Sequence, residues 1–107
     1  MAKLERTLSG DMNELLERIE TGILAGSISA TLEDKSDFTI GDTRCAVRVY
    51  ERYSYAGSNR VSLSITLFGR GNEIKLSAIT SGGSQAMFFK INTIGEKTFL
   101  HALEELL

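Results

Sequence analysis

Hydrophobic periodicity constrains the fold of this chain more than any other feature of its sequence. Between Val61 and Phe68, apolar side chains alternate with serine and threonine, which predicts a half-buried β-strand. Between Met12 and Ile23, apolar residues instead recur at helical spacing and form one stripe. A chain that changes its hydrophobic period in this way is expected to pack amphipathic helices against a sheet.

The ends of the two predicted helices are marked by capping signals. Asp11 precedes Glu14 with the spacing of a capping box, and we expect the first helix to end at Gly26. Thr93 and Glu96 repeat the capping-box spacing, so we expect the closing helix to start there. Both helices carry an apolar stripe that needs a partner, and a sheet with one apolar face supplies it.

Strands are predicted on both sides of the first helix. The extended segments are residues 3–9, 28–32, 38–50 with an interruption at Gly41-Asp42, 61–68, 74–78 and 86–91. Short polar turns between them, including residues 33–37, imply antiparallel neighbours, because a parallel return needs a longer crossover. We therefore predict a single α+β domain over residues 1–107, a two-layer sandwich in the order β-α-β-β-β-β-β-α. Two amphipathic helices cover one face of a meandering antiparallel sheet of about five strands.

A cationic surface is predicted on the side of the sheet away from the helices. If Cys45 faces the core, alternation places Arg44, Arg48 and Tyr50 on the other side, with Arg60 on the neighbouring strand. Arginines beside an aromatic ring suit phosphate or carboxylate groups. The commoner interpretation of such a pattern is a solvated face whose arginines pair with acidic residues across strands, such as Glu51 and Glu73.

A glycine-rich loop is predicted between Thr80 and Gln85. Its candidate ligand-binding residues are Ser81, Gly82, Gly83, Ser84 and Gln85. Glycine permits close approach, so the backbone N–H groups of this loop could meet an anion. No P-loop motif is present, and an ordinary connection between elements is the commoner interpretation of such a loop.

Composition excludes several classes of protein. The formal net charge is -2 and the pI is about 5.4, whereas duplex-binding domains usually carry a basic excess, so we expect no nucleic-acid partner. One cysteine and one histidine cannot hold zinc, and we expect no metal or cofactor. No apolar run is long enough to span a bilayer, and the first residues do not form a signal peptide, so we expect a cytoplasmic protein.

Three segments resemble a family of small bacterial proteins of unknown function. They are residues 26–30 (GSISA), 45–53 (CAVRVYERY) and 77–86 (SAITSGGSQA), and the resemblance extends over essentially the whole chain. It implies a compact bacterial cytoplasmic protein and brings no activity, ligand or catalytic residue with it. Separately, the order of elements is similar to that of small helix-grip ligand carriers, although likeness of fold does not establish function.

The leading hypothesis is a small non-enzymatic binding protein that contacts an anionic ligand or partner and self-associates. One alternative is a carrier of apolar molecules, with a cavity of roughly 300 Å³ or more beside residues such as Ile19, Ile65 and Phe89. Another is a purely structural homo-oligomer that buries the serine and threonine face or an edge strand. The least favoured alternative is an enzyme using Cys45 and His101, because nothing in the sequence orients the base.

Overall fold

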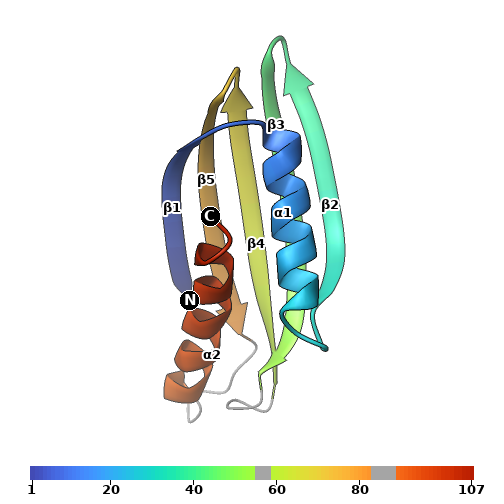
Figure 1. Ribbon diagram of the computed structural model, residues 1–107. Helices are drawn as coiled ribbons and strands as arrows, with labels where there is room; N and C mark the ends of the chain where they lie inside the picture. Colours follow the sequence, from blue (N-terminus) through green and yellow to red (C-terminus); the bar gives the residue numbers. More distant parts are fainter. Residues whose placement is uncertain (55–58, 83–88) are drawn as a thin grey trace.

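The chain forms five strands and two helices in the described residues. A computed structural model describes the backbone of residues 1–54, 59–82 and 89–107. It describes the side chains of residues 1–53, 59–82 and 95–107. The elements are β1 (Ala2–Ser9), α1 (Met12–Ala25), β2 (Thr31–Ile40), β3 (Thr43–Ser54), β4 (Asn59–Arg70), β5 (Glu73–Gly82) and α2 (Phe89–Glu104). Figure 1 shows both helices in front of one face of the sheet, as the α+β prediction required.

The sheet is antiparallel throughout, with strand order β1-β5-β4-β3-β2. Strands β2 to β5 form a meander, and β1 pairs with β5 at the far edge. Because α1 lies in the connection between the edge strand β1 and the opposite edge strand β2, this connection passes over one face of the sheet, and α1 runs along that face in front of β3 (Figure 1). The connection itself thus brings the apolar stripe of α1 onto the sheet.

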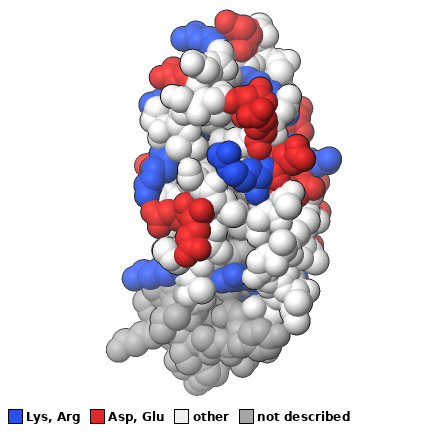
Figure 2. All heavy atoms as spheres, viewed as in Figure 1, with Lys and Arg blue, Asp and Glu red and all other residues white. Residues whose placement is uncertain are grey.

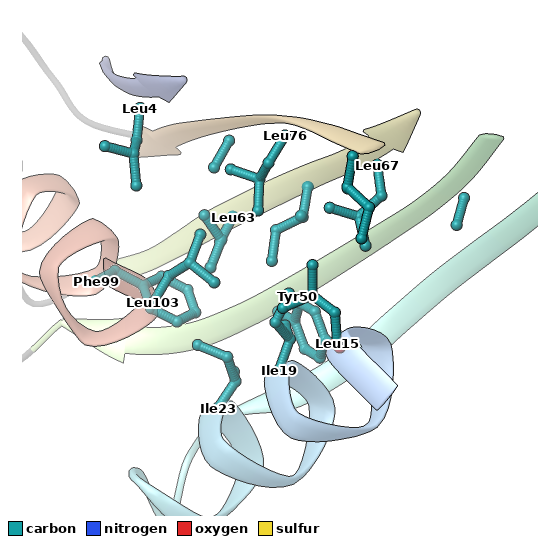
Figure 3. Packing of buried hydrophobic residues seen from close by; sticks show 14 of the residues in the cluster. Leu4, Leu15, Ile19, Ile23, Tyr50, Leu63, Leu67, Leu76, Phe99 and Leu103 are labelled. Carbon is teal, nitrogen blue, oxygen red and sulfur yellow. The ribbon is translucent and has the colours of Figure 1, made fainter. Parts of the chain in front are cut away.

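The hydrophobic core lies between the sheet and the two helices. From β4 it takes Val61, Leu63, Ile65 and Leu67, as the alternation predicted, and each is at most 1% exposed. Ile19 of α1 is fully buried against this face, and Phe99 and Leu103 of α2 fill the other half of the layer (Figure 3). We call this helix-covered side of the sheet the inner face.

The first helix has the ends that the sequence predicted. The side chain of Asp11 accepts a hydrogen bond from the backbone N–H of Glu14 at 3.0 Å, which satisfies one of the free donors of the first turn. The helix ends at Ala25, and the backbone N–H of the C-cap residue Gly26 donates to the carbonyl oxygen of Gly22.

The start predicted for the second helix was wrong. Helix α2 begins at Phe89, so Thr93 lies inside it, and residues 89–91 belong to the helix instead of the predicted strand 86–91. Residues 86–88 lie outside the described part of the chain. Glu96 does not cap a helix start; its carboxylate accepts from the backbone N–H of Gly82 and pairs with the amino group of Met1, both at 2.9 Å.

Two polar segments predicted as turns or loops are strands. Residues 33–37 belong to β2, an edge strand with only β3 as a neighbour, where charged side chains can reach solvent. Residues 80–82 are the end of β5, and Thr80 is fully buried beside Ala2 of β1. Both segments were predicted as turns or loops because they are polar. Edge strands and strand ends also tolerate polar side chains, so polarity did not distinguish the two cases.

The two sides of β3 are reversed relative to the prediction. Ala46 and Tyr50 are fully buried on the inner face and Arg48 is 8% exposed there, whereas Cys45 is only partly buried on the opposite side. Register explains the reversal, since Arg48 pairs with Ile65 and Tyr50 pairs with Leu63, and directly paired residues share a face. Apolar residues occur on both sides of β3, so alternation alone did not determine which side faces the core.

Candidate functional site

The structure does not bring the predicted site residues together on one surface. Arg44, Arg48 and Tyr50 belong to the inner face, whereas Arg60 lies on the opposite side of the sheet. Arg60 donates to Glu51 at 2.9 Å, which is the cross-strand pairing that the commoner interpretation expected.

The structure describes only two of the candidate ligand-binding residues predicted for the glycine-rich loop, and it places both in a strand. Ser81 and Gly82 are the last residues of β5, while Gly83, Ser84 and Gln85 lie outside the described residues. The N–H group of Gly82, one of the predicted anion donors, already binds the internal carboxylate of Glu96.

Arg44 and Arg48 share one carboxylate at the margin of the inner face. Both guanidinium groups donate to Oδ1 of Asp37, each at 3.3 Å, and Arg48 also lies 3.2 Å from Oδ2. Arg48 donates further to the carbonyl oxygens of Val47 and Ser36. Arg44 reaches across to the side chain of Asn13 in α1. These contacts explain how an arginine can be buried on the helix-covered side.

The charges around Asp37 shift its ionisation. Partial burial is the largest influence and by itself would raise the pKa of the carboxyl group. The hydrogen bonds and positive charges of Arg48 and Arg44 together outweigh it, so the pKa of Asp37 is lowered. The carboxylate is therefore held ionised between two cations, and it acts as an internal counter-ion.

Tyr50 places a hydroxyl group in the hydrophobic core. Its side chain is fully buried beneath α1, near Leu15 and Ile19 (Figure 3), and its hydroxyl oxygen has no hydrogen-bond partner among the residues that the structure describes. Burial, with a smaller contribution from the charge of Glu20, raises the pKa of Tyr50 to about 12. The phenol is therefore neutral at physiological pH and cannot contact a ligand at the surface.

The helix side of the molecule carries charges of both signs. Figure 2 shows Lys and Arg beside Asp and Glu over this side, in short alternating groups. The ion pair between Arg6 and Glu104 joins β1 to α2 within this pattern. An extended field of one sign, which would attract a polyanion, is not seen in this view.

The opposite side of the sheet is uncovered within the described part of the chain, and we call it the outer face. Its central side chains form three rows across the five strands. From β2 to β1 the rows are Phe38, Cys45, Phe68, Lys75 and Thr7; then Ser36, Val47, Thr66, Ser77 and Glu5; then Asp34, Val49, Ser64, Ile79 and Lys3. Within these three rows the charged side chains lie on the edge strands apart from Lys75. Beyond them, the outer-face charges lie toward the ends of β3, β4 and β5, at Glu51, Arg60, Arg70 and Glu73.

Large apolar side chains project from the outer face. Phe38 is 56% exposed, Phe68 is 54% exposed and Ile40 is 83% exposed. Together with Thr43 and Cys45 they surround a hollow of about 260 Å³. Removing apolar surface from water stabilises a complex by about 25 cal/mol per Å². An uncovered aromatic patch of this kind would therefore stabilise the binding of a molecule that covers it.

A second hollow lies on the other side of Phe68. It has a volume of about 380 Å³, and its outer-face lining consists of Glu5, Thr7, Thr66, Phe68, Lys75 and Ser77. The ammonium group of Lys75 donates to the hydroxyl of Thr7 at 3.1 Å, which holds this cation over the sheet. Phe68 thus stands between an apolar hollow and a polar one.

Sequence reasoning missed this patch although β4 carried a signal for it. Phe68 falls on the serine and threonine side of the most regular strand, where an aromatic residue is out of place. Because Cys45 was predicted to face the core, the apolar residues on the same side of β3 were predicted to be buried as well. In the structure this side of β3 belongs to the outer face, where Phe38, Cys45 and Phe68 lie in one row.

The two residues of the predicted Cys45 and His101 enzyme site lie on opposite sides of the sheet. Cys45 lies on the outer face, whereas His101 belongs to α2 on the inner side, where it contacts Glu105 at 2.8 Å. The described residues contain no group of three or more potential metal ligands. On the helix side, one hollow of about 160 Å³ lies at the start of α1, below the size expected for a carrier.

Comparisons with known proteins identify one family. A model described as "Family of unknown function (DUF6054)" matches residues 1–107. No curated protein and no solved structure matches the chain. In the described residues, neither helix is long and apolar enough to cross a membrane.

Proposed function

Because the chain belongs over its whole length to the family of unknown function DUF6054, we propose a function from its geometry: it is a small non-enzymatic binding protein that contacts a protein partner through its outer face. The observation that supports this proposal is the uncovered row of Phe38, Cys45 and Phe68. A sheet with only one covered face usually presents polar residues on the other. Exposed aromatic residues there are typical of interaction surfaces.

A photocrosslinking experiment tests whether the outer face is in contact with a partner. Replacing Phe68 by a benzophenone amino acid puts a reactive group on the face while keeping an aromatic side chain. Ile28, which is fully exposed in the connection between α1 and β2, is the matched control position. Irradiation of cells that naturally make the protein is expected to give a defined adduct from position 68 and none from position 28. Equal labelling, or no labelling, would contradict the proposal.

A second candidate function is binding of an anion beside Arg44, as a cytoplasmic anion-binding protein. Two guanidinium groups share the single carboxylate of Asp37, which leaves an excess positive charge, and the side chain of Arg44 is 31% exposed. Titration calorimetry with a panel of phosphorylated metabolites is expected to give heat with the natural protein and none with Arg44→Gln. The same absence of heat in both proteins would remove this candidate.

A further inference from the structure

We propose that the partner seated on the outer face is a second copy of the chain, so that two sheets pack face to face in a homodimer. This inference rests on the proposed function, since it names the occupant of the same surface. The resulting arrangement would have helices outside and two sheets inside, in the manner of aligned sheet packing with about 10 Å between the sheets.

The edges of the sheet are poor sites for joining two copies. Edge strand β2 carries four charged residues within 33–37, and its pairing with β3 shifts register between Leu32 and Asp34. Charges and irregular pairing are the features that prevent edge-to-edge association. The other edge, β1, carries Lys3, Glu5 and Arg6. Self-association through the face is therefore favoured over extension of the sheet.

The size of the outer face fits a stable dimer. Five strands at about 4.8 Å spacing, each contributing about ten residues at about 3.3 Å, cover an area of roughly 800 Å². A standard protein–protein interface buries about 800 Å² on each partner. One copy of the sheet can thus cover the face of the other, whereas a single peptide strand or a small molecule would leave most of it exposed.

The outer face also carries both halves of a complementary shape. Phe38 and Phe68 project from it, and the hollows beside Phe68 measure about 260 and 380 Å³. A cavity of about 150 Å³ is enough to hold a benzene molecule, so each hollow can receive an aromatic ring. A two-fold interface places the same surface on both sides, and rings from one copy then meet hollows of the other.

The centre of the face has the chemistry that this contact needs. In the two rows next to that of Phe68, the pairs between β3 and β4 are Val47 with Thr66 and Val49 with Ser64, and all four residues are uncharged and partly buried already. Small and apolar side chains let two sheets approach closely, and Lys75, which pairs with Phe68, is the one cation of these rows away from the edge strands; its ammonium group keeps the hydroxyl of Thr7 as a partner in the contact. Charged residues such as Asp34 and Lys3 lie at the two edges, where they would form the rim of the interface.

Sedimentation equilibrium of the full chain tests the proposal. We expect a concentration-dependent dimer of twice the 11.7 kDa chain mass. Phe68→Ser is expected to raise the dimer dissociation constant about tenfold or more, as loss of a large aromatic anchor at an interface does. Ser64→Lys, which keeps Phe68 and adds a charge at the centre, should weaken the dimer as well. Ile28→Ser removes an exposed apolar side chain elsewhere and should leave the constant unchanged.

The outcomes separate this inference from the proposed function. Circular dichroism of each variant confirms that the monomer remains folded. A natural protein that stays monomeric at every concentration, or a dimer that neither Phe68→Ser nor Ser64→Lys weakens, would overturn the homodimer. If the crosslink from position 68 then identifies a different protein, the outer face is still a binding surface. If position 68 gives no crosslink either, both proposals fail.

Discussion

At the scale of single residues, Tyr50 and Arg48 show how β3 meets the core. Both are polar residues on the inner face, yet only Arg48 has partners, because Asp37 and two backbone carbonyl groups accept from its guanidinium. The hydroxyl of Tyr50 has none in the described structure. A buried polar atom without a hydrogen bond costs free energy, so the two residues are expected to respond differently to substitution.

Tyr50→Phe is predicted to stabilise the fold by about 1 kcal/mol at neutral pH, because it removes an unpaired buried hydroxyl and keeps the ring. Chemical denaturation of both proteins measures the difference. A loss of more than about 1 kcal/mol would show that the hydroxyl has a partner that holds it.

The same pair of proteins gives a prediction for alkaline pH. The pKa of Tyr50 is raised from 10.0 to about 12, so between these values the unfolded chain loses the phenol proton first. The natural protein is therefore expected to lose about 2 kcal/mol of stability relative to Tyr50→Phe as the pH rises through this range. A difference that is constant with pH would contradict the burial of this phenol.

Asp37→Asn is predicted to destabilise the fold by about 1 kcal/mol at neutral pH, a value discounted because the carboxylate is partly exposed. It would leave Arg48 buried without its counter-ion. Since the pKa of Asp37 is lowered, its contribution is present above the unfolded value of 3.8 and is lost as the pH falls through the folded value.

Glu51→Gln is the matched control for Asp37→Asn. It removes a carboxylate of similar exposure from the ion pair with Arg60, but the side chain of Arg60 is 48% exposed, whereas that of Arg48 is 9% exposed. Its effect on the free energy of unfolding is expected to stay below about 0.5 kcal/mol. Equal effects of the two substitutions at neutral pH would mean that burial of Arg48 does not depend on Asp37.

At the scale of elements, the predictable parts are those with one unambiguous apolar face. Helix α1 was predicted with both ends, and β4 with the correct side, because each has a single stripe between clear signals. Strand β3 has apolar residues on both sides. Its pairing with β4, and not its own pattern, therefore determines which of its sides faces the core. The run 86–91 lacked any period, and its last residues proved to be helical.

The candidate site was less predictable than the fold for the same reason. A site depends on which residues share a side, and a strand shifted by one residue exchanges its two sides completely. The error at β3 placed Arg48 and Tyr50 outside and Cys45 inside, although each residue was correctly assigned to a strand. The long stem of arginine and the ring of tyrosine both tolerate burial, which weakened the polar signal.

Asp11→Ala tests how far the α1 cap supports the layer above the sheet. Its side chain accepts from the N–H of Glu14 at 3.0 Å, so its removal is expected to cost about 1 kcal/mol. Asp11→Asn, which keeps an acceptor, should lose much less. Thermal denaturation of the three proteins checks the order, and equal melting temperatures would show that the cap adds nothing.

At the scale of the whole molecule, the described residues form a sheet with one covered face and one face that none of them covers. The two helices bury the inner face, and β1 at one edge is tied to α2 by the pair between Arg6 and Glu104. Within the described residues, the large apolar side chains that the strands leave exposed all belong to the outer face; they are Phe38, Ile40, Tyr53, Phe68 and Ile79. In the proposed homodimer, the sheets of the two copies would pack against each other and bury these exposed side chains.

The alkylation rate of Cys45 is the most direct test of the homodimer, because the single thiol lies beside Phe68 on the outer face. With a maleimide under native conditions, the account predicts fast modification in dilute protein and a rate that falls as the concentration rises and a second copy covers the face. A thiol that resists modification at every dilution would place Cys45 in the core. A rate independent of concentration would show that no second copy covers it.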